Sequence, residues 1–193
     1  PFVPIDLKCG ENTTVGPCIS EEALAAAFTA WLGGFTVSGG TEPVTVTYMV
    51  NDVAVNLVDL LPPDKCRGGT ITVVAHASDF CEVTADCSGT FTVLPDELAP
   101  AIVCPADVTF ECVIGDAGMA TATDDCDLNP LVSGPEVIGS LDNCGLGTLT
   151  YRWTATDCAG NSSSCDQLVT VVDNTPPAIV CPADVTFECV IGD

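Results

Sequence analysis

A stretch of 17 residues, PAIVCPADVTFECVIGD, occurs twice without a difference, at 100–116 and at 177–193. The two copies start 77 positions apart, a spacing that matches the size of a small domain. Residues 100–176 are therefore predicted to form one complete unit, and residues 177–193 the first strand of the next, truncated one. The same ending, a β-rich run followed by acidic residues and proline, closes the segment 1–99, which is predicted to form a unit of its own. The chain is expected to be a window from something longer.

Apolar and polar residues alternate through both units, which predicts strands. The clearest case is 149–156, where alternate residues from Leu149 to Ala155 share one face. A Gly-Asn turn follows and leads into a further β run, which predicts a hairpin with Trp153 in the core. Residues 100–176 show no helical pattern. Short strands separated by turns predict an immunoglobulin-like antiparallel β-sandwich.

The first unit differs by one predicted helix over about residues 20–32. Ser20 can cap it, apolar side chains fall on one face, and a Gly-Gly pair ends it. We expect this helix to lie across one face or end of the sheets. The predicted fold class is all-β, with tandem, disulfide-rich immunoglobulin-like modules and one inserted α-helix in the first.

Thirteen cysteines are spread along the chain, with no CxxC pair and a single histidine. Zinc and iron–sulfur sites are therefore poorly supported. The remaining interpretation is a disulfide framework, which needs an oxidising compartment outside the cytoplasm. The protein is expected to be secreted and to work outside the cell or at its surface.

Matching the strand ends within each unit predicts how the cysteines pair. In an immunoglobulin-like sandwich the first strand can lie parallel to the last, which places the cysteines at one end or the other of the unit. The predicted bridges are Cys104–Cys165, Cys126–Cys158 and Cys112–Cys144 in the second unit, and Cys9–Cys87 and Cys18–Cys66 in the first. Cys81 lacks a partner near Thr41 and is predicted to be a free thiol. Cys181 and Cys189 are expected to pair with residues beyond Asp193.

The net charge of −23, from 27 acidic and four basic residues, limits the partners of this chain. Such a surface repels nucleic acid and anionic membranes. No apolar run is long enough to span a bilayer, so direct membrane insertion is not expected. No catalytic motif is present, and His76 is interpreted as an ordinary strand residue, so the protein is predicted not to be an enzyme.

Acidic loops form the one candidate site in the sequence. Calcium prefers oxygen ligands, which carboxylates and amides in loops supply. The candidate calcium ligands are Asp124, Asp125, Asp127 and Asp157 at one predicted end of the second unit, and Asp173 and Asn174 in the linker. The alternative is that these acids are simply solvated loop residues.

Several motifs together resemble a known family. CPADVTFEC, the TATDDC run, YRWTATDCAGNSSSC and VTVVDNTPPAIVCP are similar to hyalin-repeat (HYR-like) modules, which are immunoglobulin-like units found in tandem in very large surface proteins. The first unit, with EEALAAAFTAWLGGFTVSGG, resembles a module that alternates with such repeats in giant adhesins of Bacteroidetes. Among these are the SprB-like gliding-motility adhesins exported by the type IX secretion system. In that family a cysteine often follows SGG, whereas Thr41 stands there in this chain. The resemblance implies adhesion or fibre building and supplies no catalytic residues.

Repeats, dense disulfides and missing catalytic groups favour a segment of a long extracellular fibre or adhesin stalk, for attachment or gliding motility. Its partners would be the neighbouring repeats of the same chain, and other copies where stalks join into a filament. The alternatives are a discrete module that binds glycans or a protein, and an accessory domain of a secreted enzyme.

Overall fold

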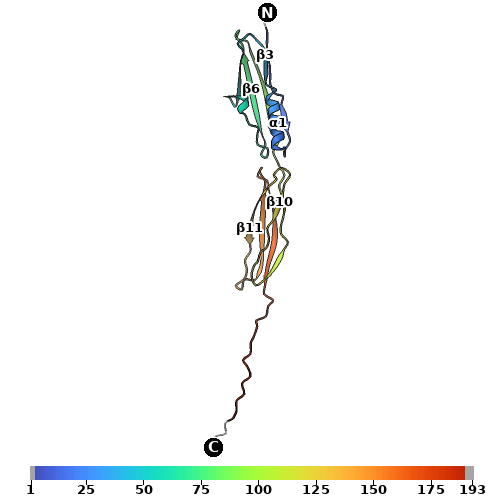
Figure 1. Cartoon of the computed structure of the whole chain (residues 1–193), viewed down its shortest axis with the longest axis vertical. Coiled ribbons are helices and arrows are strands. Elements are labelled where there is room, and N and C mark those ends of the chain that lie inside the picture. Colours follow the sequence, from blue (N-terminus) through green and yellow to red (C-terminus); the bar gives the residue numbers. More distant parts are fainter. Residues whose placement is uncertain (1–2, 190–193) are drawn as a thin grey trace.

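The computed structural model describes residues 3–189, and its strands fall into two groups that lie end to end (Figure 1). We call β1 to β7 with helix α1 the first unit, and β8 to β13 the second unit. The strands of both units run roughly along the long axis of the molecule (Figure 1). The predicted fold class is confirmed, since the chain is mostly β with two sandwich-like units and one helix in the first.

The first unit is built on a five-stranded sheet in the order β2-β7-β6-β4-β5, with β1 paired to β3 beside it. Its short strand β2 lies parallel to the last strand, β7, and the other pairs are antiparallel. The elements are β1 (Ile5–Lys8), β2 (Thr13–Val15), α1 (Glu21–Leu32), β3 (Thr36–Gly39), β4 (Thr45–Val50), β5 (Val53–Val55), the 3-10 turn η1 (Leu57–Asp59), β6 (Gly69–Ser78) and β7 (Thr84–Val93).

Helix α1 begins as predicted, because the Ser20 hydroxyl accepts a hydrogen bond from the Ala23 N–H at 3.2 Å. Its apolar face covers one face of the five-stranded sheet, and the ring of Phe28 lies 5.1 Å from that of Phe91 on β7. Trp31 is also buried in this cluster. The helix is 12 residues long, and no helix among the described residues could cross a lipid bilayer.

The second unit pairs a four-stranded sheet, β11-β12-β13-β9, with a two-stranded one, β8-β10. As the sequence predicts, a strand near the start of the unit lies parallel to the last one, with Val108 of β9 opposite Val169 of β13. The long hairpin β12–β13 is also where it was predicted. The strands are β8 (Ala101–Val103), β9 (Val108–Glu111), β10 (Thr121–Thr123), β11 (Leu131–Ile138), β12 (Gly147–Thr156) and β13 (Ser162–Val172).

The core of the second unit lies on the inner face of this hairpin. Trp153 is buried there, as predicted, together with Leu149 and Ala155 of the same strand. Gln167 is wholly buried on β13, and its amide donates hydrogen bonds to two loop carbonyls at 2.8 and 2.7 Å. These bonds tie the loops on either side of β9 to the main sheet.

Residues 177–189 leave the far end of the second unit and form no helix or strand (Figure 1). Their sequence repeats residues 100–112, which include β8 and β9. Ile179 and Phe187 are each 88% exposed, whereas Ile102 and Phe110, their equivalents, are partly buried. The same residues thus form strands only where the rest of a unit surrounds them.

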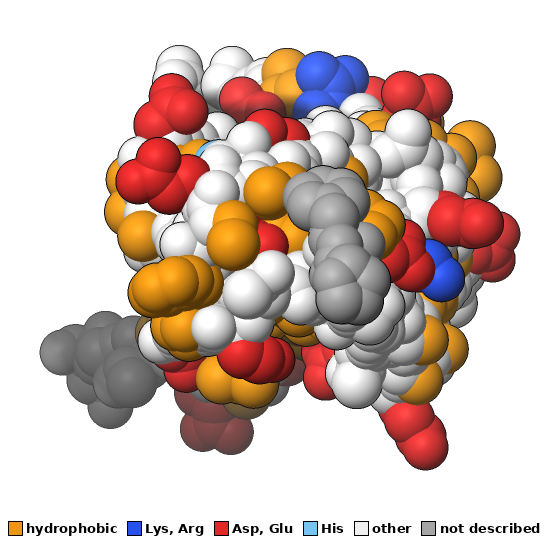
Figure 2. Space-filling model, turned by 90° about the horizontal axis from the view of Figure 1, so that it is seen from above, with side chains coloured by type: hydrophobic (Ala, Val, Ile, Leu, Met, Phe, Trp, Pro, Cys, Tyr) orange, Lys and Arg blue, Asp and Glu red, His pale blue; other side chains and the backbone are white. Residues whose placement is uncertain are grey.

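Acidic side chains are prominent on the end of the molecule shown in Figure 2. Seen along the long axis, they project on every side, and few Lys or Arg side chains interrupt them (Figure 2). His76 lies on β6, and its Nδ1 pairs with Asp86 across on β7, an ordinary cross-strand contact.

Candidate functional site at the junction of the two units

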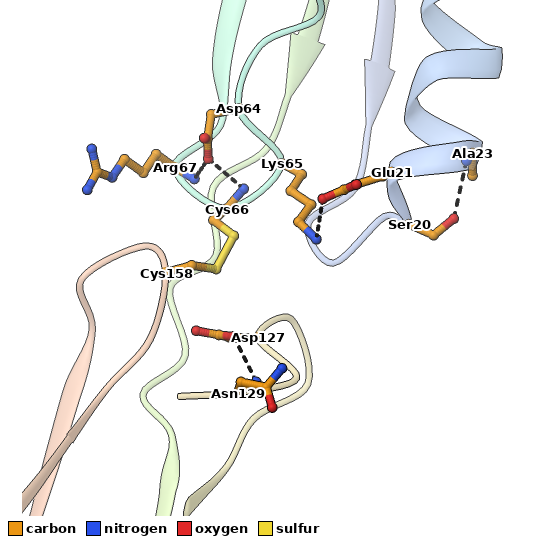
Figure 3. A network of polar contacts seen from close by, with 10 residues as sticks. All are labelled: Ser20, Glu21, Ala23, Asp64, Lys65, Cys66, Arg67, Asp127, Asn129 and Cys158. Carbon is orange, nitrogen blue, oxygen red and sulfur yellow. Dashed lines mark hydrogen bonds and ion pairs between the residues drawn. A yellow bond between two sulfur atoms is a disulfide. The ribbon is translucent and has the colours of Figure 1, made fainter. Parts of the chain in front are cut away.

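Two disulfides cross from the first unit to the second. Cys18 bonds to Cys126 over a sequence separation of 108 residues. Cys66 bonds to Cys158 over a separation of 92 residues (Figure 3). In the chain-entropy model, closing a loop of this length lowers the entropy of the unfolded chain and so stabilises the folded state by about 4 to 5 kcal/mol. The contributions of two overlapping loops are not additive. The linker between β7 and β8 makes a third connection.

The predicted pairs Cys18–Cys66 and Cys126–Cys158 are therefore wrong. Strand direction correctly placed each pair at one end of its unit. It could not reveal that these two ends face each other, so that four cysteines meet at the junction. Each of these cysteines bonds to a cysteine of the other unit instead of one in its own.

Aspartates fix the loops that carry these cysteines. Asp64 Oδ1 accepts hydrogen bonds from the N–H groups of Arg67 and Cys66, both at 2.8 Å (Figure 3). The bond from Arg67 contributes most to holding the pKa of Asp64 below its ordinary value. Asp124 fixes the loop of Cys126 in the same way, because its Oδ1 accepts the Cys126 N–H at 2.9 Å.

The hairpin loop that carries Cys158 is closed by Asp157. Burial acts to raise the pKa of Asp157, but hydrogen bonds from the Asn161 amide and from the N–H groups of Gly160 and Asn161 outweigh it and lower the pKa. This carboxylate is therefore charged although it is buried.

Asp96, in the linker, connects both units. Its N–H donates to the carbonyl of Cys66 at 2.8 Å, and its own carbonyl accepts from the Asn161 amide at 3.0 Å. Its side chain is turned inward and only 5% of the residue is exposed. Oδ1 accepts the N–H of Leu98 at 3.0 Å, whereas Oδ2 is buried and has no hydrogen-bond partner within residues 3–189.

Three carboxylates meet at this place. One oxygen each from Asp96, Asp124 and Asp157 lie within 4.8 Å of one another. Closely spaced carboxylates repel one another, and a buried oxygen without a partner is costly. A calcium ion takes six to eight oxygen ligands and would offset both effects, so these residues fit a cation chemically.

The structure brings together only two of the six predicted calcium ligands. Asp124 and Asp157 come together, while Asp125 is exposed and Asp127 accepts the Asn129 N–H in its own loop. Asp173 and Asn174 follow β13 and lie at the opposite end of the second unit, because that strand runs the whole length of the unit.

Asp96 was missed in the sequence. The signal was present, because it occupies the same kind of acidic, proline-flanked linker as Asp173.

The remaining cysteines lie within single units. The structure contains the predicted bridges Cys9–Cys87 and Cys104–Cys165. Within residues 3–189, Cys81 forms no disulfide, in agreement with the prediction of a free thiol. Cys181 and Cys189 are likewise unpaired within this range, and their expected partners lie outside the sequence.

The predicted bridge Cys112–Cys144 is wrong, and both thiols are exposed and free in the described residues. Cys112 lies beside Glu111 and Asp173 at the far end of the second unit. Desolvation by the surrounding atoms raises the pKa of the Cys112 thiol, and the charge and hydrogen bond of Asp173 and the charge of Glu111 raise it further.

Solved structures similar to this chain are distant. The human mucin-like protocadherin EC1-2 is 10% identical, with 88% of this chain and 98% of that chain covered and a TM-score of 0.32. The protocadherin γB4 extracellular domain is 13% identical, with 89% of this chain and 35% of that chain covered and a TM-score of 0.32. Mouse cadherin-23 EC22-24 is 13% identical, with 89% of this chain and 67% of that chain covered and a TM-score of 0.32. Likeness of this size supports no inference about function.

No curated protein matches the chain significantly. The four disulfides found among residues 3–189 indicate a protein that folds in an oxidising, extracellular setting. Residues 92–171, which span most of the second unit, match the family model described as an HYR-like domain with 4 cysteines.

Proposed function

We propose that this chain is a segment of a long extracellular stalk or fibre of a cell-surface adhesin, in which units follow one another end to end. The observation that carries the proposal is the junction, where two disulfides and the linker connect the units three times. A stalk needs neighbouring units held in line, whereas a binding module or an accessory domain works without such a connection. The HYR-like match of residues 92–171 supports the same function.

The finer parts of the proposal rest on the sequence motifs. We assign residues 1–99 to a module with an inserted helix, 100–176 to an HYR-like repeat and 177–193 to the start of another repeat. The adhesin would stand on a bacterial surface, reach it by type IX secretion, and serve attachment or gliding. Its surface charge opposes side-by-side packing, so the primary partners are the neighbouring units of the same chain.

Imaging of the native particle tests this function. Antibodies raised against the 193-residue chain should label thin, regularly beaded fibres on the surface of intact source cells in negative-stain electron micrographs. Label on compact secreted particles, or only inside the cell, would contradict the proposal.

We also propose that a calcium ion binds at the junction through Asp96, Asp124 and Asp157. It would neutralise three close carboxylates and stiffen the connection between the units. The support is the buried Asp96 Oδ2, which has no hydrogen-bond partner among the described residues. A ligand at 100 times its Kd stabilises the folded state by about 2.7 kcal/mol.

Thermal unfolding with calcium and with chelator tests this site. Calcium should raise the melting temperature, and Asp96→Asn should remove most of that rise. Glu97→Gln makes a similar charge change at the exposed neighbouring position and should leave the rise intact. A melting temperature that chelator does not move would reject the calcium site and leave the stalk function standing.

A further inference from the structure

Cys144 occupies in the second unit the position that Cys66 occupies in the first. Each cysteine donates its N–H to the Oδ1 of an aspartate two residues earlier, Asp142 or Asp64, at 2.8 Å in both cases. Each loop then leads into the long inner strand of its unit, β6 or β12. Both cysteines therefore leave the same end of their units and share the same hydrogen bond to a preceding aspartate.

Cys112 corresponds in the same way to Cys18. Each follows the short strand, β2 or β9, that pairs in parallel with the last strand of its unit. Each has a left-handed backbone, with φ of 62° for Cys18 and 65° for Cys112, which is rare for a residue other than glycine. Each also lies beside the acidic residue of the following linker, Asp96 or Asp173.

The two pairs differ in their bonding. Cys18 and Cys66 do not bond to each other, because both are bonded to the unit that follows. Cys112 and Cys144 are free among the described residues, at the end of the second unit from which residues 177–189 leave. That segment carries the sequence of the next unit's first strands but forms no strand. The far end of the second unit is thus built like the outgoing half of the observed junction.

We propose that Cys112 and Cys144 form the same two-disulfide connection to a following copy of the second unit, with the copies of Cys126 and Cys158 as partners. This inference rests on the proposed function, because only a tandem array supplies that unit. Each bridge forms by thiol–disulfide exchange with a disulfide oxidant such as oxidised glutathione. Two thiols lose two protons and two electrons and become one disulfide, while the oxidant is reduced to two thiols.

A lengthened chain tests the proposal. A copy of residues 117–176 is added after Asp193, which completes the unit that begins at Pro177. In this chain Cys189 and the added copy of Cys144 are changed to Ser, so that the new unit has no outgoing thiols. The added copy also carries Asp125→Glu and Ala159→Ser, so that its peptides differ in mass from those of the second unit.

The lengthened chain is refolded in a glutathione redox buffer, alkylated without reduction, digested with pepsin at acid pH and mapped by mass spectrometry. Peptides with Cys112 should be bonded to the added copy of Cys126, and peptides with Cys144 to the added copy of Cys158. Cys81→Ser should leave this map unchanged. A bridge between Cys181 and the added copy of Cys165 shows that the new unit has folded.

With that folding bridge present, free alkylated Cys112 and Cys144, or a bond between the two, would overturn the proposal. Such a result would leave the stalk function untouched, because imaging of native fibres tests that function separately. Conversely, the two bridges could form in a chain that imaging shows not to be fibrous, and then only the proposed function would fail.

Discussion

At the scale of single residues, the acidic side chains of this protein act on its cysteines. Asp64, Asp124 and Asp142 each accept the N–H of a cysteine two positions later and so fix its loop. Asp173 and Glu111 act differently, because their charges oppose ionisation of the neighbouring Cys112 thiol. Since the thiolate is the reactive form, these carboxylates slow the reactions of Cys112.

Asp173→Asn should therefore make Cys112 react faster. The amide removes one of the negative charges that raise the pKa of the Cys112 thiol, so more thiolate is present at any pH below that pKa. We expect a severalfold faster reaction with iodoacetamide at pH 7.5, measured by timed alkylation and mass spectrometry. The rate of Cys144 in the same sample is the internal control, and an unchanged rate of Cys112 would contradict the assignment.

At this scale the sequence predicted where the cysteines lie better than which cysteine each one bonds to. Strand direction correctly assigned the ends at which Cys18, Cys66, Cys126 and Cys158 lie. Which cysteine each one bonds depends on how two folded units meet, and no local pattern contains that information. The acidic, proline-flanked linker around Asp96 is visible in the sequence, but the contacts of Asp96 with Cys66 and Asn161 depend on how the two units meet.

At the scale of elements, long periodic patterns were predicted well. Helix α1 has a cap, an apolar face and a Gly-Gly stop, and it lies where these signals place it. The hairpin β12–β13 likewise follows from strict alternation around a turn. The repeated segment shows where such patterns fail, because 101–111 forms two strands and the identical 178–188 forms none. A short strand depends on its neighbours for hydrogen bonds and burial.

Phe28→Ala should show how far the first unit depends on its helix. Phe28 is 3% exposed and packs against Trp31 and Phe91, and replacing such a ring costs about 3 to 5 kcal/mol. Urea unfolding followed by Trp31 fluorescence, in a Trp153→Phe background, should show a lower midpoint. Phe80→Ala removes the same ring from a site 72% exposed in the same unit and should change stability by less than about 0.5 kcal/mol. Equal losses in the two variants would contradict this packing.

At the scale of the whole molecule, the junction decides the shape. A linker alone would let two units swing relative to each other. Here two disulfides at different loops fix their relative orientation as well as their distance. The long straight outline of the chain therefore depends on covalent bonds between the units (Figure 1).

Serine in place of all four junction cysteines, at 18, 66, 126 and 158, should release this constraint. In chelator, small-angle X-ray scattering should show a broader distribution of maximum dimensions, while both units keep their β-sheet circular dichroism. The matched control changes Cys81, Cys112 and Cys144 to Ser, which breaks no disulfide of the part of the chain that the structure describes. Identical scattering from the two variants would show that the linker alone sets the orientation.

The bridges within each unit also decide how the molecule responds when it is pulled from its two ends. Tension that separates the strands cannot lengthen the segments enclosed by Cys9–Cys87 and Cys104–Cys165, because each sulfur–sulfur bond carries the load past them. Only the short stretches outside these loops can be drawn out, chiefly 87–104 and the residues after 165. In oxidising surroundings the chain would behave as a nearly inextensible cable, and a reducing agent would turn the same chain into an elastic one.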